Sequence, residues 1–332
     1  MILCGDIGGT KTLLALGAEG PGASRLVFER RYASSDYADL DGMIDVFLAQ
    51  ARSAGHPVKA LSAACFGVAG PVAGGRAKVT YLPWILDAGA LAGRHDLPSV
   101  LLLNDFAAAA AGIATLGPED LVTLQAGEPL AHAPRAVLGA GTGLGVAFLL
   151  PEGGGWRTLA GEGGHVGFAP ADDEQIALWQ FLHRQHGRVT AERVLSGSGL
   201  VDVYRFVSSE RMPPESPDPL AAEVPAAAIA AAAQAHSSGA AAHSLELFAA
   251  VYGAFAGDLA LTVMARGGVF LAGGIAPKIL PWLRQAGFAA AFNAKGAHSA
   301  LAASMPVHVV VNERLGLQGA AWLALAAARR PE

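Results

Sequence analysis

The sequence predicts an α/β protein with two lobes, and three observations lead to this prediction. Apolar strand-like runs alternate with segments of helical spacing along the chain, as in βα units. The 332 residues suffice for two separate cores, and 52% are hydrophobic against 15% charged, as in a compact protein. Two glycine-rich hairpins, one in each half of the chain, predict that the two lobes are alike.

The first elements are expected in the opening third of the chain. Residues 1–16 place a Gly-rich turn between two apolar runs, which is typical of a β-hairpin. A helix should begin at Leu40, with Ile44 and Phe47 on one face. The runs "LSAACFGVAGPVAGG" (61–75) and "SVLLLNDF" (99–106) predict buried strands, and the Ala-rich segment after the second predicts a helix.

The second half repeats this plan. Ala136 to Leu150, "AVLGAGTGLGVAFLL", is again an apolar run, a Gly-rich core and an apolar run. The remaining expected elements are a helix near 172–187, a helix starting near Thr190, a surface helix plus linker in 212–239, a helix through 245–259, a strand, Gly loop and helix in 267–280, and a closing strand and helix in 308–328.

Composition excludes several classes of protein. The net charge of −5 gives no nucleic-acid footprint. Cys4 and Cys65 are the only cysteines and lie far apart, which excludes a disulfide scaffold or a Cys-rich zinc site and fits a reducing cytosol. The sequence shows no signal peptide, and Gly, Thr or Asp interrupts the apolar runs, so we expect no membrane partner and a cytoplasmic protein.

The glycine loops match neither common nucleotide template. In "GDIGGTKT", Thr10 stands where a P-loop needs its second Gly, and a strand follows instead of a helix. In "GAGTGLG" the glycines alternate, unlike the dinucleotide fingerprint. Both loops can therefore be plain turns that need Gly for positive φ, or loops whose bare N–H groups approach phosphate oxygens.

Three features favour the phosphate interpretation. The first loop carries a carboxylate, hydroxyls and a cation among its glycines, the second carries Thr142 between glycines, and a third Gly pair lies where a strand gives way to a helix. The candidate nucleotide-binding residues are Gly5, Asp6, Gly8, Gly9, Thr10, Lys11, Gly141, Thr142, Gly143, Gly273 and Gly274.

These loops resemble a known superfamily. "DIGGTKT", "GAGTGLG" and "LAGGI" are similar, in order, to the two phosphate loops and the adenosine-side loop of the sugar kinase/heat-shock ATPase/actin superfamily. "LLLNDF", "GEGGHVGFAP", "AERVLSGSGL", "VFLAGGIAPKIL" and "GFAAAFNAKG" resemble the bacterial glucokinases over nearly the whole chain. No Cys-rich motif follows His165, so the chain resembles their zinc-free branch.

The resemblance implies a fold and an activity. The fold would be the two-lobed actin-like ATPase (ribonuclease H-like) fold with a ligand cleft between the lobes, the smaller lobe being 1–114 plus 316–332 and the larger 115–315. The activity would be transfer of the γ-phosphoryl of ATP to the 6-hydroxyl of glucose, with Asp105 as general base. Asp6 would hold Mg²⁺ through water, and the protein would be a homodimer.

The resemblance also implies a set of sugar ligands. They are Asn104, Asp105, Glu162, His165 and Glu192, whose carboxylate, amide and imidazole groups suit vicinal hydroxyls. Two of them have a structural alternative. Asp105 can be a helix-capping carboxylate beside an N-cap Asn104, and Glu192 can stabilise the first turn of a helix opened by Thr190.

Three rival functions are weaker. A kinase for another hexose, such as mannose, fructose or an amino sugar, is the nearest, because Tyr81 stands near the sugar side where many family members have Asn. A sugar-sensing regulator would need a DNA-binding helix-turn-helix, and the phosphate hairpin begins directly after Met1. A chaperone-like ATPase would have no use for "NDF", "GEGGH" and "AERVLSG" together.

Overall fold

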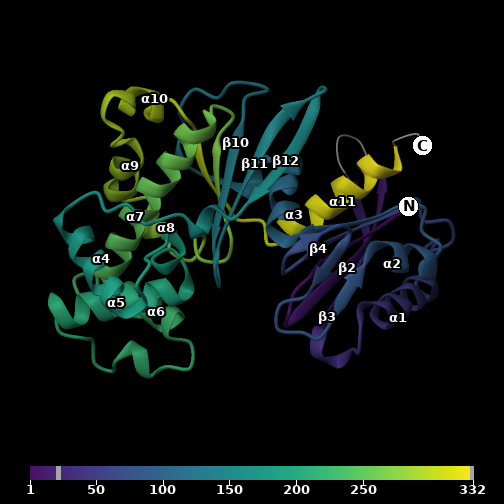
Figure 1. The fold of residues 1–332 in the computed structure, drawn as a ribbon, viewed down its shortest axis with the longest axis horizontal. Helices are drawn as coiled ribbons and strands as arrows, with labels where there is room; N and C mark the ends of the chain where they lie inside the picture. Colours follow the sequence, from purple (N-terminus) through teal and green to yellow (C-terminus); the bar gives the residue numbers. More distant parts are fainter. Residues whose placement is uncertain (20–23, 330–332) are drawn as a thin grey trace. The chain divides into compact units, whose positions relative to one another are not determined.

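The computed structural model describes residues 1–19 and 24–329, which form two compact units (Figure 1). Unit 1 comprises Met1–Pro118, Gly155–Ala160 and Asn312–Glu332, and unit 2 comprises Glu119–Gly154 and Gly161–Val311. Strands and helices interleave in both units, which confirms the predicted α/β class.

The sheet of unit 1 gathers the ends of three parallel strands at one edge. Its order is β3-β2-β1-β4-β8, and β1 pairs antiparallel with β2 as the predicted hairpin. Strands β1, β4 and β8 are parallel, with Ile7 in register with Val68 and Val68 with Asn104. Ligands of α/β proteins bind at such carboxyl edges. The strands are β1 (Ile2–Ile7), β2 (Lys11–Glu19), β3 (Ser24–Ala33), β4 (Ala63–Val68) and β8 (Val100–Asn104).

Helices cover both faces of this sheet (Figure 1). Period-two alternation sends Leu3 toward α1 and Cys4 toward α11, so each face has its own apolar cluster. On the second face α3 and α11 cross closely, because Gly112 and Gly319 carry no side chain at the contact. The helices are α1 (Leu40–Ser53), α2 (Ala88–His95), α3 (Asp105–Gly112) and α11 (Leu315–Ala328).

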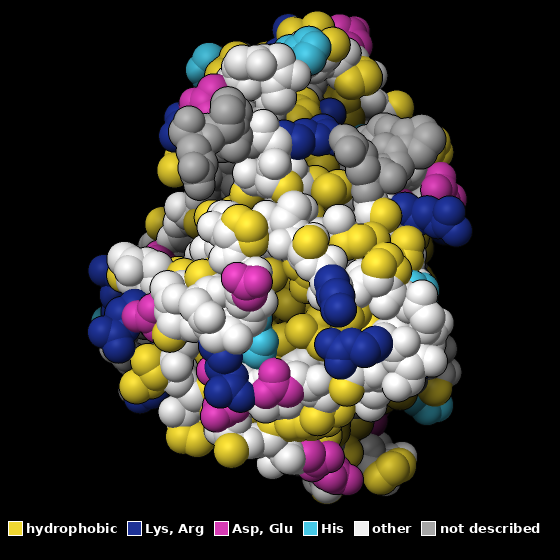
Figure 2. Space-filling view, turned by 90° about the vertical axis from the view of Figure 1, so that its right-hand side faces the viewer, with side chains coloured by type: hydrophobic (Ala, Val, Ile, Leu, Met, Phe, Trp, Pro, Cys, Tyr) yellow, Lys and Arg dark blue, Asp and Glu magenta, His cyan; other side chains and the backbone are white. Residues whose placement is uncertain are grey.

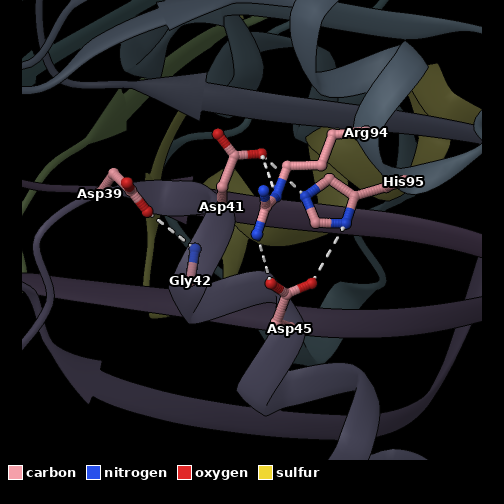
Figure 3. A network of polar contacts seen from close by, with 6 residues as sticks. All are labelled: Asp39, Asp41, Gly42, Asp45, Arg94 and His95. Carbon is pink, nitrogen blue, oxygen red and sulfur yellow. Dashed lines mark hydrogen bonds and ion pairs between the residues drawn. The ribbon is translucent and has the colours of Figure 1, made fainter.

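A polar cluster joins the start of α1 to the end of α2 (Figure 3). The Arg94 Nη2 atom lies 2.7 Å from Asp45 Oδ2, and the His95 Nε2 atom lies 2.9 Å from Asp41 Oδ1. The His95 side chain is only 3% exposed, so its contact is shielded from water. Because α2 is the element that precedes β8, this cluster stabilises the segment that leads into the strand ending at Asn104.

Unit 1 also carries a small three-stranded sheet, ordered β5-β6-β7. Its strands are β5 (Val72–Ala73), β6 (Arg76–Lys78) and β7 (Ile85–Asp87). The loop from β6 to β7 is anchored by buried Val79 and Trp84, whose backbones are joined by a Val79 N–H to Trp84 carbonyl bond of 3.1 Å.

The sheet of unit 2 repeats the topology of unit 1. The strands within unit 2 have the order β11-β10-β13-β14-β9, in which β10 pairs antiparallel with β11 and parallel with β13, as β1 pairs with β2 and β4. The two glycine hairpins therefore occupy equivalent positions in the two sheets. The strands are β9 (Leu121–Gln125), β10 (Arg135–Ala140), β11 (Leu144–Glu152), β13 (Val269–Ala272) and β14 (Val307–Val310). Strand β12 (Gly155–Gly161) belongs to unit 1 except for its last residue.

The helices of unit 2 correct one prediction. The helix expected from Thr190 is wrong, because residues Ala191–Arg193 form a single 3₁₀ turn. The helix begins instead at Gly197, where the Ser196 hydroxyl accepts the Gly199 N–H at 3.0 Å as its N-cap. The helices are α4 (Asp173–His186), α5 (Gly197–Glu210), α6 (Pro225–Ala235), α7 (Ala240–Val263), α8 (Leu280–Leu283), α9 (Ala286–Asn293) and α10 (Ser299–Ala303).

Helix α7 is the central core helix of unit 2. By length and composition it could cross a membrane, but 56% of its apolar window is buried inside the protein. Leu245, Phe248 and Tyr252 are fully buried in the main apolar cluster. Its apolar character is thus explained by packing within the unit. On the face drawn in Figure 2, acidic and basic side chains are interspersed with hydrophobic ones, which is typical of a solvated surface.

Candidate active site

The turn between β1 and β2 is held by Ser34, which sequence reasoning missed. The Ser34 hydroxyl donates to the Gly8 carbonyl at 2.8 Å, and the Ser34 N–H donates to the Thr10 carbonyl at 3.0 Å. Thr12 is fully buried and its hydroxyl lies 3.0 Å from that of Ser34. Thr12 is therefore an internal anchor, whereas Thr10 and Lys11 are exposed and free to meet a ligand.

Close packing explains the glycines of this turn. Gly8 and Gly9 do not have positive φ. A Cβ at Gly8 would lie 2.8 Å from the Lys11 carbonyl oxygen, and one at Gly9 would lie 2.5 Å from the Thr80 carbonyl oxygen. The interpretation as a turn that needs positive φ is thus wrong here. Gly5 lies inside β1, where it packs against Leu14 and Phe66.

Replacement of Ser34 tests this anchor. In Ser34→Ala, the buried Thr12 hydroxyl loses its partner, so we expect the free energy of unfolding to fall by about 1–3 kcal/mol. The KM for ATP, the substrate that the family resemblance implies, should rise several-fold. Denaturant titration and steady-state kinetics measure the two effects. Adding Thr12→Val removes the unpaired hydroxyl and should recover stability without recovering the KM. An unchanged KM for ATP in Ser34→Ala would contradict the anchoring role.

Two carboxylates meet at the carboxyl edge of the unit 1 sheet. Asp6 is near the end of β1, and Asp105 directly follows β8. Burial, and after it the charge of Asp105, raise the pKa of Asp6 from 3.8 to about 6, although Lys11 opposes the shift. Burial also raises the pKa of Asp105, against the hydrogen bond donated by the Phe106 N–H. Both groups are therefore stronger bases than a free aspartate.

The raised pKa of Asp6 predicts a pH dependence of stability. Between about pH 4 and 6 the folded chain holds a proton on Asp6 that the unfolded chain has lost, so the free energy of unfolding falls as pH rises through this window. Asp6→Asn removes that loss and should be more stable than the parent at pH 7 by up to about 3 kcal/mol, with no gain below pH 4.

Urea titrations of both chains from pH 3.5 to 7.5, without nucleotide or divalent cation, measure this difference. A variant that is less stable than the parent at pH 7, or a difference that is constant with pH, would contradict the assignment of the shift to Asp6.

Asn104 caps helix α3 and is held by its neighbours. Its Oδ1 atom accepts the N–H groups of Phe106 at 3.0 Å and Ala107 at 3.3 Å, and its Nδ2 atom donates to the Gly70 carbonyl at 3.3 Å. The capping role considered from the sequence is thus present. The Asn104 side chain also hydrogen-bonds the Asp105 carboxylate, which opposes the rise in the pKa of Asp105. Asp105 is the first helical residue, and its Oδ1 atom accepts the Phe106 N–H at 2.8 Å.

In unit 2 the three predicted sugar ligands lie together. His165 stands between two carboxylates, with its Nε2 atom 3.9 Å from Glu162 Oε2 and its Nδ1 atom 4.0 Å from Glu192 Oε1. Glu162 precedes a 3₁₀ turn (Gly163–His165) whose last residue is His165. The turn packs closely on β11, where a Cβ at Gly163 would be 2.8 Å from the Val146 Cβ. The glycines of the "GEGGH" motif therefore allow this turn to pack closely against β11.

Glu192 couples this group to the second glycine loop. Its Oε2 atom accepts the Leu144 N–H at 2.8 Å, and a Cβ at Gly143 would lie 2.5 Å from that oxygen. Its Oε1 atom faces His165. One carboxylate thus fixes the glycine turn and presents a second oxygen beside the imidazole, a role beyond the helix stabilisation considered from the sequence.

The second and third glycine loops lie side by side at the carboxyl edge of the unit 2 sheet. The Ala140 carbonyl accepts the Ile275 N–H at 3.2 Å, and a Cβ at Gly273 would lie 2.6 Å from that oxygen. Gly141 and Gly274 have nothing near the Cβ position, and Thr142 is exposed. These bare backbone segments are open to a ligand.

The chemistry of Asp6 fits a nucleotide-bound Mg²⁺. The described residues hold no cluster of three or more His, Cys, Asp or Glu side chains that could bind a metal alone. Mg²⁺ instead favours one or two carboxylates together with waters and substrate phosphates. A buried carboxylate with a raised pKa next to an exposed Lys11 and a glycine turn offers that donor set.

Unit 2 also contains an apolar pocket of about 340 Å³. Helix α7 contributes Val251, Phe255 and Leu259, β11 contributes Val146 and Phe148, and the segment around Glu162 contributes Gly161, Gly163 and Val166. The side chains of Glu162, His165 and Glu192 do not line it. The pocket therefore borders the segments that carry the predicted sugar ligands without including their side chains.

The repeated sheets with glycine loops at their carboxyl edges define the class as the actin-like ATPase fold of the sugar kinases. The structure matches a glucokinase from an Antarctic psychrotroph with a TM-score of 0.87, at 29% identity and 98% coverage of each chain. It shares its fold with a ROK family glucokinase from Streptomyces griseus, with a TM-score of 0.64, 22% identity and coverage of 98% of this chain and 99% of that one.

The chain belongs to the glucokinase family. The family model "Glucokinase" matches residues 3–327. The glucokinase of Nostoc sp. strain PCC 7120 is 42% identical over 343 aligned residues, which cover 98% of each protein. The predicted family, fold class and hexose kinase class are thereby confirmed.

Proposed function

We propose that this protein is a glucokinase that transfers the γ-phosphoryl group of ATP to the 6-hydroxyl of glucose, giving glucose 6-phosphate and ADP. The observation that carries the proposal is the placement of Asp105 at the carboxyl edge of the unit 1 sheet, with Asp6 and the β1–β2 glycine turn, in a chain of the glucokinase family. The Streptomyces griseus structure contains glucose and AMPPNP, which agrees with this choice of substrates.

Asp105 is the proposed general base. Its raised pKa makes the carboxylate a stronger proton acceptor than a free aspartate, and the Phe106 N–H fixes one of its oxygens. In the proposed step the other oxygen takes the proton of the 6-hydroxyl as that oxygen attacks the γ-phosphorus. Asn104 would present its amide group to a neighbouring sugar hydroxyl.

Unit 2 supplies the remaining sugar contacts in this proposal. Glu162, His165 and Glu192 present acceptors and one imidazole to the other hydroxyls of the ring. A sugar that lacks or inverts one of these hydroxyls leaves a polar group unpaired, which costs affinity. The site is thus suited to discriminate among hexoses.

The glycine loops are the proposed phosphate and nucleotide contacts. Gly8 to Lys11 form a bare turn, closed by the Gly8 N–H to Lys11 carbonyl bond of 3.0 Å, and add one cation. Gly141 to Gly143 form a second bare turn, which Glu192 holds through the Leu144 N–H. Gly273 and Gly274 would lie on the adenosine side. Mg²⁺, held by Asp6 through water, would neutralise charge on the transferred phosphoryl group.

The test is formation of sugar 6-phosphate with Mg-ATP over a panel of glucose, mannose, fructose and glucosamine. We expect a clear preference for glucose in kcat/KM. Preference for another hexose would still support a hexose kinase, but its substrate would then be the other hexose, the alternative that Tyr81 suggests. ATP hydrolysis without sugar phosphate would contradict the proposed function.

We also propose a cytoplasmic homodimer that serves the first step of glucose use in glycolysis. The family resemblance supports the dimer, which light scattering of the purified protein measures. Cys4 and Cys65 are in register on neighbouring strands and both are free, which supports a reducing compartment.

A further inference from the structure

The tip of the β6–β7 loop presents an aromatic side chain that packing does not explain. Tyr81 has a φ of +67° and is 87% exposed. Left-handed backbone is costly for a bulky residue, and such strain persists where the surroundings impose it, often at ligand sites. Among the described residues the Tyr81 phenol makes no hydrogen bond, so the ring is free on its outer side.

The loop tip is fixed against the β1–β2 turn. Tyr81 packs against Gly9, where a Cβ would lie 3.4 Å from the Tyr81 Cβ and 3.5 Å from its Cδ2 atom. The Thr80 N–H donates to the Ala69 carbonyl at 2.8 Å, and the Leu82 N–H donates to the Val79 carbonyl at 3.3 Å. The ring is therefore held beside the proposed phosphate turn by the backbone on both sides of it.

The same tip is connected to the strand end that carries the base. The Thr80 hydroxyl lies 3.3 Å from the Cβ position of Gly70, and the Gly70 carbonyl accepts the Asn104 amide at 3.3 Å. Gly70 has a φ of +152° and no room for a side chain, so the three segments are tightly joined. Tyr81 thus stands where the phosphate turn and the Asn104–Asp105 strand end converge.

We propose that Tyr81 is a specificity-determining residue whose ring packs against the C–H face of the bound hexose. The inference rests on the proposed function, because it places the sugar at Asn104 and Asp105. An aromatic ring with one apolar face and a polar tip matches a pyranose, which presents axial C–H groups between its hydroxyls. In the proposed function the nucleotide base would lie at the far end of the phosphates, which leaves the hexose as the ligand group for this ring.

Three variants separate the ring from the backbone. Tyr81→Asn removes the ring and keeps a residue that tolerates left-handed backbone, so the loop should keep its shape. We expect its KM for glucose to rise about three- to tenfold, with kcat and the KM for ATP within about twofold of the parent. Tyr81→Phe keeps the ring and should stay within about twofold in all three. Tyr81→Gly should have the same kinetic constants as Tyr81→Asn and a melting temperature equal to or higher than that of Tyr81→Asn.

The measurements are steady-state kinetics on the full chain and calorimetric titration of glucose without nucleotide. The calorimetry distinguishes two failures, because it reports glucose binding even if the parent chain phosphorylates no hexose. An unchanged glucose affinity in Tyr81→Asn would overturn the inference and leave the kinase function intact. A rise confined to the KM for ATP would also overturn it, by placing the ring on the nucleotide.

Discussion

Asp105→Asn should lower kcat for glucose phosphorylation by about 10²- to 10⁴-fold and leave glucose affinity within a few-fold of the parent. Asparagine keeps the size of the side chain and the oxygen that accepts the Phe106 N–H at 2.8 Å, so helix α3 keeps its start. It loses the raised basicity of the carboxylate, which burial provides. Coupled kinetics and glucose calorimetry measure the two quantities.

A second aspartate provides the matched control. Asp87 caps helix α2, where its carboxylate accepts the Ala90 N–H at 3.0 Å, and it lies outside the proposed site. Asp87→Asn should retain parental kcat. If Asp105→Asn retained full turnover, Asp105 would be a capping residue and the base would have to be found elsewhere.

Glu192→Ala should lower kcat/KM for glucose by about 10²- to 10³-fold, because this carboxylate has two tasks. Its Oε2 atom fixes the glycine turn through the Leu144 N–H, and its Oε1 atom faces His165 in the proposed sugar group. The alanine variant should therefore raise the KM for both glucose and ATP. Initial-rate kinetics with each substrate varied in turn measure both constants.

Glu192→Gln separates the two tasks. Its amide oxygen can still accept the Leu144 N–H, so the turn and the KM for ATP should stay near the parental values. The lost charge should still weaken glucose binding. Equal, less than twofold effects of Gln and Ala on both KM values would show that Glu192 serves neither task.

The sequence was informative where pattern and chemistry are local. The β1–β2 hairpin, the strand before Asp105 and helix α7 follow from apolar periodicity that their neighbours do not override. The three glycine loops could be recognised because bare backbone recurs at ends of strands. The grouping of Glu162, His165 and Glu192 came from the family resemblance, since they are separated in the sequence and no periodicity links them.

Other features depend on contacts that are distant in the sequence. Ser34 belongs to no motif, and only the pairing of β2 with β3 brings it to Gly8 and Thr12. Helix α5 starts later than expected, because Ser196 provides a better cap than Thr190. The β5–β6 hairpin had a local signal, the Gly74–Gly75 pair with positive φ, which is characteristic of two-residue hairpin turns.

The strain at Tyr81 was also invisible in the sequence. The sequence marks Tyr81 only as a departure from the family asparagine, and the left-handed conformation explains why asparagine suits the position. Because the tyrosine ring that replaces the asparagine is proposed to contact the hexose, the Tyr81 variants should be measured on the same hexose panel as the parent.

The most direct test of the glucokinase assignment is transfer of an isotopically marked phosphoryl group. ATP with ¹⁸O on the γ-phosphate is incubated with the protein, Mg²⁺ and glucose, and the products are analysed by ³¹P NMR and mass spectrometry. The proposed reaction predicts that the marked phosphoryl group is found on the 6-oxygen of glucose. Marked inorganic phosphate with unmodified glucose would contradict it.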